Sequence, residues 1–122
     1  MFNHIMLGAD DVAVSKRFYD AVLGALGIEP GTTDENGRCL FRTSGGTLML
    51  KNPIDGEAAS HGNGSTIGFR AGSTDEVDAW HAAGVANGGT TCEDPPGLRP
   101  SGVYLAYLRD PIGNKLCAVF RP

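Results

Sequence analysis

Two segments of the chain place apolar residues at the spacing of a helix that buries one face. Between residues 12 and 26 the apolar positions follow i, i+1, i+4, i+5 and i+8, at Phe18, Tyr19, Val22, Leu23 and Leu26. Asp10 or Asp11 stands just before this segment, and either carboxylate suits the N-cap of a helix. We therefore expect a first helix that stops at Gly27.

A second helix is predicted from a capping box. Ser73 and Glu76 stand three residues apart, the spacing at which each side chain can bond to the other's backbone N–H. This helix is expected to run to about Asn87, where two glycines follow. The residues expected to be buried in part are Val77, Trp80, His81 and Val85.

Short apolar runs between turn residues predict strands over much of the remaining chain. We expect them at 3–8, near Ile28, and at 39–43, 47–51, 65–71, 90–93, 103–109 and 116–121. Residues 110–114, Asp-Pro-Ile-Gly-Asn, have the proline and glycine of a tight turn between the last two strands. Residues 95–102 are expected to form a loop, acting either as a lid or as a rigid spacer.

The two halves of the chain repeat one another. A shift of about 62 residues aligns Ile5 with Ile67, Leu7 with Phe69, Phe18 with Trp80, Ala21 with Ala83 and Gly27 with Gly89. Each half has the order strand, helix, three strands, and such a repeat indicates two modules with a shared core. We predict one α+β domain over 1–122, with a first module at about 1–52, a linker at about 53–64 and a second module at about 65–122.

Composition and charge exclude several classes of function. The 122 residues carry a formal charge of −4, whereas nucleic-acid binding requires a basic face. The chain has neither the long apolar run of a membrane helix nor the basic start of a signal peptide. Cys39, Cys92 and Cys117 are odd in number and far apart, which excludes a disulfide framework and a zinc ribbon. We expect a cytoplasmic protein without nucleic-acid or membrane partners.

Taken together, these features resemble the vicinal oxygen chelate superfamily, which includes glyoxalase I, extradiol dioxygenases, fosfomycin-resistance enzymes and bleomycin-resistance proteins. The resemblance rests on His4, Phe18-Tyr19, Leu26-Gly27, Asn63-Gly64 and the segment 107–115 around the last turn. It implies two tandem βαβββ modules that form an open, cup-shaped mixed β-sheet with the helices on its outer face. It also implies a homodimer.

Strand alternation, read with this resemblance, predicts the residues on the concave face of the sheet, here called the cup. Ile5, Leu48 and Ile67 are expected to pack under the helices, so their neighbours point into the cup. The expected ligand-binding residues are His4, Met6, Met49, Thr66, Arg70, Tyr107 and Cys117. Arg70 is a candidate to hold an anionic ligand, with a solvated sheet edge as the alternative.

The metal enzymes of the superfamily bind their ion through four cup positions, which the resemblance assigns to His4, Met49, Thr66 and Cys117. Only His4 matches the usual His, Glu or Gln. Methionine suits soft metals and threonine is a poor ligand. His4 and Cys117 remain, and two side chains do not make a stable metal site. We therefore expect no metal and no other cofactor, with a divalent metal as the alternative.

His4 and Cys117 are the candidates for catalysis, because a cysteine beside a histidine can act as a nucleophile. The sequence offers no oxyanion donor or third residue for such a pair. The alternatives are a hydrogen-bonded wall residue for His4 and a small buried side chain for Cys117.

Three functions follow from these patterns. The favoured one is a glyoxalase/bleomycin-resistance-like protein that binds a small organic molecule in the cup without a divalent metal. The second is a metal-dependent lyase or dioxygenase of the glyoxalase type with a degenerate site. The third is a relic or interaction module without catalysis, because one fold carries many functions. Whether the chain is an enzyme is left open by its sequence.

Overall fold

In a computed structural model that describes residues 1–122, each half of the chain begins with the predicted strand and helix, and the second half has one short strand more than the repeat predicts. The first half consists of β1 (His4–Gly8), α1 (Val12–Gly24), β2 (Thr32–Thr33), β3 (Cys39–Thr43) and β4 (Gly46–Lys51). The second half consists of β5 (Ile67–Arg70), α2 (Thr74–Ala86), β6 (Thr90–Thr91), β7 (Gly97–Leu98), β8 (Tyr104–Arg109) and β9 (Lys115–Phe120).

The strands form two mixed sheets, one from each half. The first has the order β1-β4-β3-β2, and the second has the order β5-β9-β8-β6, with β7 also paired to β8. β1 is parallel to β4 and β5 is parallel to β9, while the other neighbours are antiparallel. The predicted α+β class with two tandem modules and an open sheet is confirmed. β1 and β5 each lie at the edge of their own sheet and are not paired with each other.

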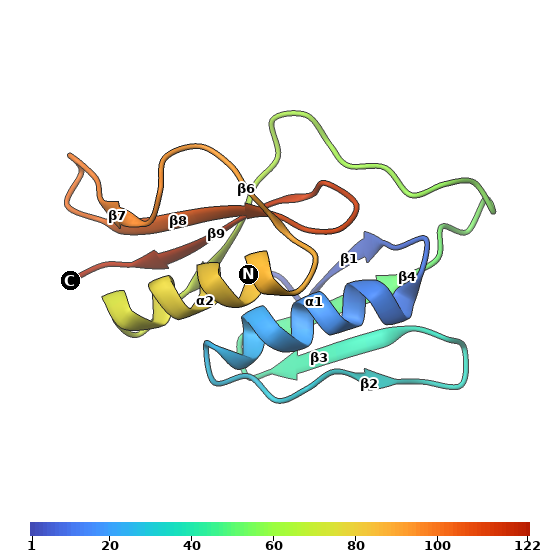
Figure 1. Ribbon diagram of the computed structural model, residues 1–122. Coiled ribbons are helices and arrows are strands. Elements are labelled where there is room, and N and C mark those ends of the chain that lie inside the picture. Colours follow the sequence, from blue (N-terminus) through green and yellow to red (C-terminus); the bar gives the residue numbers. More distant parts are fainter.

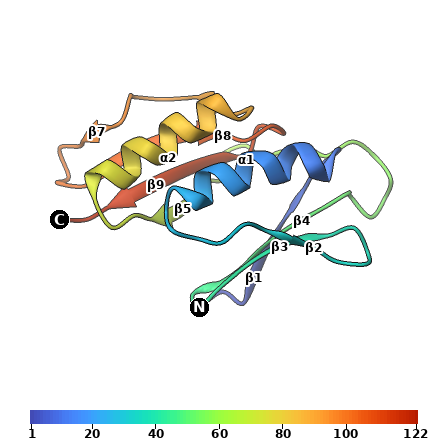
Figure 2. The ribbon, with the colours of Figure 1, turned by 60° about the horizontal axis from the view of Figure 1, so that its bottom comes forward.

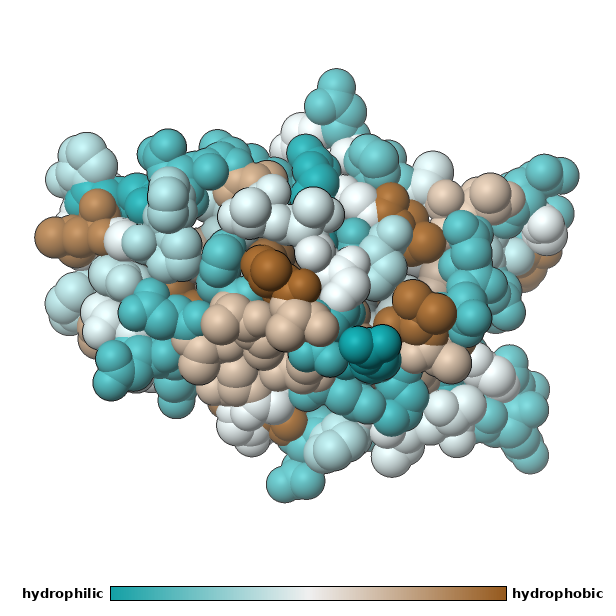
Figure 3. All heavy atoms as spheres, viewed as in Figure 1, coloured by the Kyte–Doolittle hydropathy of each residue, from teal (hydrophilic) through white to brown (hydrophobic).

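Both helices lie on the same side of the strands, with α1 and α2 packed side by side (Figures 1 and 2). A single buried cluster joins the two halves and includes Phe18 and Trp80, the aligned aromatic residues of the repeat. Gly84 lets the elements approach closely, since a Cβ there would lie 2.2 Å from Leu108 Cδ1 and 3.1 Å from Val22 Cγ1. On the helical face, strongly apolar residues form separate spots among polar ones (Figure 3), as is usual for an exposed surface.

The predicted helix starts are confirmed. The Asp11 carboxylate accepts hydrogen bonds from the N–H groups of Ala13 and Val14, so Asp11 is the cap of α1. The Ser73 hydroxyl accepts from the N–H of Glu76, as a capping box requires. The Glu76 carboxylate accepts from the N–H of Gly72, one residue earlier than the motif predicts.

Three local predictions are wrong. The strand expected near Ile28 lies instead at Thr32–Thr33, because residues after α1 continue as a turn bonded back to Leu23. α1 ends at Gly24, two residues before Leu26. Val85 is half exposed, in keeping with its expected partial burial, and Gly84 is the residue that faces β8. The loop 95–102 contains β7, which pairs with β8.

A buried carboxylate ties the two halves together. Asp110 Oδ1 accepts hydrogen bonds from the N–H groups of Ile112, Gly113 and Asn114, so the turn after β8 closes around it. Asp110 Oδ2 accepts from the Tyr19 hydroxyl of α1 at 2.6 Å. Both residues are buried, and burial followed by the nearby Asp110 charge raises the pKa of the Tyr19 hydroxyl well above 10.

Neither helix has the length and apolar character needed to cross a lipid bilayer.

We predict that Tyr19→Phe lowers the free energy of unfolding by about 2 kcal/mol, because it removes a buried hydrogen bond to a charged group. Tyr104→Phe is the matched control, since it removes a similar bond to Asp78 at the protein surface and should have a smaller effect. Urea denaturation of the three proteins measures the difference. If the two variants lost the same free energy of unfolding, the buried bond would contribute no more than the bond at the surface.

The same bond predicts a dependence on pH. The unfolded tyrosine ionises near pH 10, whereas burial keeps Tyr19 protonated in the folded protein. Its stabilisation is therefore complete below pH 10 and falls by about 1.4 kcal/mol for each further pH unit. The stability difference between the native protein and Tyr19→Phe should narrow from pH 8 to pH 11. A constant difference would show that Tyr19 ionises normally in the folded state.

Candidate functional site

The first sheet carries an apolar row on the face turned away from α1. Met6 of β1 lies beside Met49 of β4, which lies beside Leu40 of β3. Met49 and Leu40 are buried, whereas Met6 is 45% exposed. The structure thus brings together two of the predicted ligand-binding residues, Met6 and Met49, as flexible apolar side chains that can adapt to a ligand.

The second sheet carries a matching row formed by Gly68, Cys117 and Tyr107, which are neighbours across β5, β9 and β8. A Cβ at Gly68 would lie 3.3 Å from Cys117 Sγ, so the thiol lies against bare backbone. Burial raises the pKa of the Cys117 thiol, and the Lys115 charge only partly opposes this shift. The thiol is therefore protonated at neutral pH and is a weak nucleophile.

An ion pair that sequence reasoning missed flanks this second row. The Lys115 ammonium group pairs with the Glu93 carboxylate and lies 4.9 Å from the centroid of the Tyr107 ring. The hydrogen bond to Glu93 raises the pKa of Lys115. Glu93 has a φ of 55°, the left-handed conformation, and is the one residue other than glycine that adopts it. The last strand was predicted to begin at residue 116, so Lys115 was assigned to neither face, and no local pattern indicated a partner from residue 93.

His4 and Cys117 do not meet within the chain. His4 is exposed on β1 of the first sheet, and its Nδ1 lies 2.7 Å from Asn3 Oδ1. Cys117 lies on β9 of the second sheet, behind the edge strand β5. This contact joins two exposed neighbours in the chain and does not involve Cys117. The cysteine–histidine nucleophile considered from sequence is not assembled here.

The two tyrosines of β8 point to opposite faces. Tyr104 packs against the core and its hydroxyl donates to Asp78 Oδ1 of α2 at 2.8 Å. Tyr107 lies beside Cys117 on the other face, where the sequence analysis expected it. Thr66 is exposed and precedes β5 by one residue.

The residues at the metal-ligand positions do not fit a divalent ion within one chain. His4 lies on the first sheet and Cys117 on the second, and the two positions between them in the chain are Met49 and Thr66, which are weak ligands. The fold brings together no group of three or more His, Cys, Asp or Glu side chains with metal-binding geometry. A divalent ion usually needs three or four such ligands.

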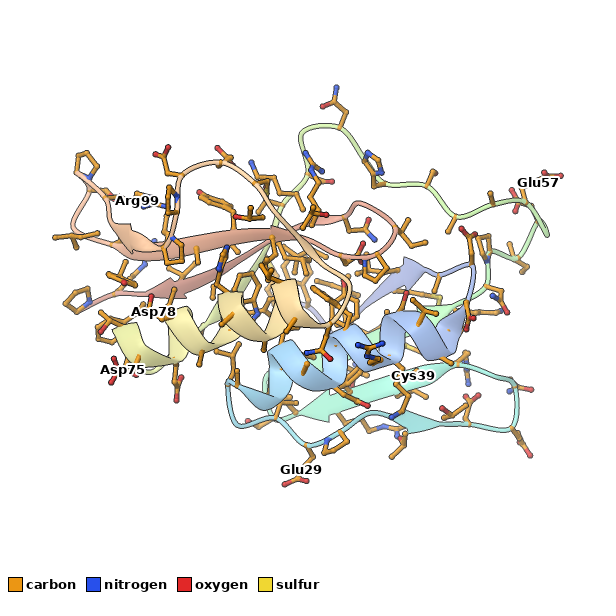
Figure 4. All side chains as sticks on the ribbon, viewed as in Figure 1. Glu29, Cys39, Glu57, Asp75, Asp78 and Arg99 are labelled. Carbon is orange, nitrogen blue, oxygen red and sulfur yellow. The ribbon has the colours of Figure 1, made fainter.

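The loop before β8 is held by its own arginine. The Arg99 guanidinium donates to the backbone carbonyls of Asp94, Pro95 and Gly97 at 3.3, 3.0 and 3.3 Å. Figure 4 shows Arg99 within this loop, at the end of the molecule formed by the second half. Together with the pairing of β7 to β8, these bonds favour a rigid spacer over a mobile lid.

A cavity of about 440 Å³ opens between the edge strands, and we call it the β1–β5 cavity. Its walls come from the start of β1, the start of β4, the C-terminal end of α1 and all of β5. Nine of its 17 lining residues are hydrophobic, among them Ile5, Leu26, Ile67 and Phe69. Of the predicted ligand-binding residues, His4 and Arg70 line this cavity.

Sequence reasoning did not identify this cavity. It assigned Ile5 and Ile67 to the helix-packed face, and both do pack against the core cluster. Because their strands are sheet edges, the same side chains stay partly exposed to the space between the two sheets. The repeat pattern shows which residues face the helices, but it carries no information about how far the two modules splay apart.

Comparison with known proteins agrees with this architecture. The family model described as Glyoxalase/Bleomycin resistance protein/Dioxygenase superfamily matches residues 1–118. A search of curated protein sequences finds no match.

Several solved structures are similar. A glyoxalase/bleomycin resistance protein from Albidiferax ferrireducens is 58% identical, with a TM-score of 0.95 over 100% of this chain and 99% of the other. A lactoylglutathione lyase from Agrobacterium tumefaciens is 25% identical, with a TM-score of 0.67 over 98% and 92% of the two chains. A glyoxalase-related enzyme from Fulvimarina pelagi shares the fold at 24% identity, with a TM-score of 0.80 over 100% and 88%.

The two βαβββ modules, the closed Asp110 turn and a family match over nearly the whole length lead to one conclusion: the chain belongs to the glyoxalase/bleomycin resistance protein/dioxygenase superfamily.

Proposed function

We propose that the protein binds a small organic molecule in the β1–β5 cavity and on the adjoining cup, without a divalent metal. The observation that carries the proposal is the cavity itself, which has about 440 Å³ and mainly hydrophobic walls. Binding sites for small molecules are commonly concave, largely apolar and about 300–1,000 Å³ in volume. The cavity also includes His4 and Arg70, which supply the few polar groups that such sites use for orientation.

Metal independence is supported by the chemistry of the available donors. Met49 and Thr66 stand where the family resemblance would require good ligands, and neither supplies a strong donor for a hard divalent ion. Burial raises the pKa of the Cys117 thiol and so disfavours the thiolate, the form that binds a metal. The 25% identity with a lactoylglutathione lyase makes a metal-dependent lyase the competing proposal.

We predict that purified protein carries much less than one metal ion per chain and gains none when titrated with zinc, nickel, manganese, cobalt or iron(II). Elemental analysis and calorimetry measure this directly. A thermal-shift screen of apolar small molecules should in contrast yield ligands, because a ligand that binds only the folded state raises its stability. One metal per chain that is lost in His4→Ala would overturn the proposal in favour of the lyase.

We also propose a homodimer in which the edge strands meet a second copy. β1 and β5 each have one free edge, and free edges favour pairing with another chain. Phe2 is 66% exposed and Met6 is 45% exposed beside these edges, so a partner would bury apolar surface there. A second copy lying along either edge would add a wall to the β1–β5 cavity.

Light scattering is expected to give twice the chain mass of 12.7 kDa. Met6→Lys should shift the protein towards the monomer, because it places a charge at the proposed contact. Val14→Lys is the matched control, since Val14 is similarly exposed but lies on α1. A native protein that stays monomeric at all concentrations would rule the dimer out.

A further inference from the structure

The charge of the β1–β5 cavity is opposite in sign to that of the whole protein. The chain has 14 acidic and 10 basic residues, yet none of the 17 residues that line the cavity is acidic. Arg70, on β5, is the one arginine or lysine among them. It takes part in no ion pair and no side-chain hydrogen bond, unlike Lys16, Arg38 and Lys115, which are each paired with a carboxylate.

Three acidic residues labelled in Figure 4 lie at the periphery of the molecule, away from this cavity. Along the chain, the acidic residue nearest to a lining residue is Glu29, which follows Ile28 and points outward in Figure 4. Glu57 projects from the linker and Asp75 from the start of α2, also at the periphery of the molecule (Figure 4). None of the three salt bridges of the structure involves Arg70, so its guanidinium has no carboxylate partner within the chain.

The rest of the lining selects the body of the ligand. Ile5, Ile67 and Phe69 are partly exposed and lie on the two strands that border the cavity. Burying apolar surface against them contributes about 25 cal/mol for each Å² removed from water. A volume of about 440 Å³ accommodates a ligand on the order of ten to twenty non-hydrogen atoms, since one water occupies about 30 Å³.

We propose that the cavity selects a small organic monocarboxylate with an alkyl or aryl body, which is a refinement that rests on the binding function proposed above. The carboxylate pairs with the Arg70 guanidinium, whose planar fork can hold both carboxylate oxygens. The apolar body lies against Ile5, Ile67 and Phe69. The uncompensated charge gives the cavity its preference for anions over neutral or cationic molecules of the same shape.

The test uses three probes of one shape, octanoate, 1-octanol and octylamine, titrated into the full-length ¹⁵N-labelled protein and followed by NMR. Octanoate should bind most tightly and shift the amide signals of residues 67–70. Arg70→Gln should weaken octanoate binding about tenfold, equivalent to about 1.4 kcal/mol, and leave 1-octanol binding unchanged. Arg17→Gln is the matched control, because it removes the same charge from α1. It should alter the binding of neither octanoate nor 1-octanol, since Arg17 does not line the cavity.

The outcomes separate the two proposals. If 1-octanol binds as tightly as octanoate, or if Arg70→Gln has no effect, the selection of anions is overturned while binding of small molecules stands. If octanoate binds but shifts the amide signals of residues outside the cavity, the proposed location of the binding site is overturned. If none of the three probes binds and the thermal-shift screen is also negative, both proposals fail.

Discussion

The hydrogen bond between Tyr19 and Asp110 is the constraint on which the arrangement of the two modules depends. Tyr19 belongs to α1 of the first half, and Asp110 lies in the last turn of the second. The other side of that turn is bound by the linker, because His61 Nδ1 lies 3.1 Å from the carbonyl oxygen of Ile112. Gly113 makes room for the ring, since a Cβ there would lie 2.6 Å from Nδ1. One short turn therefore holds a helix from the first module and the segment that joins the modules.

This anchoring fixes the helices but leaves the sheets apart. The modules are joined through the contact of α1 with α2, the shared core cluster and the Asp110 turn. Nothing on the strand side compels the edges of β1 and β5 to pair. The space between them is consequently open and lined by side chains that would otherwise complete the core, such as Ile67 and Phe69. The cavity is thus a direct result of joining two modules by their helices.

Much of this fold could be predicted from the sequence because local patterns determine it. Asp11, Ser73 and Glu76 act as caps, and the aligned Phe18 and Trp80 both lie in the core. What could not be predicted depends on distant pairs. The left-handed Glu93 reaches Lys115 across 22 positions, and Tyr19 reaches Asp110 across 91. Strand alternation gives the face of a residue, but not the residue from another segment that meets it.

Electrostatics then distinguishes the cup from the cavity. In the cup, Cys117 is neutral, Met6 and Met49 are apolar, and the charges of Lys115 and Glu93 compensate each other. A ligand there would gain mainly from apolar burial, which is not directional. In the cavity, Arg70 is uncompensated, and a charge-assisted hydrogen bond to it is both stronger and directional. The resemblance assigns weak donors to the metal positions, so in the proposed binding mode the arginine at the edge of β5 is the group that orients the ligand.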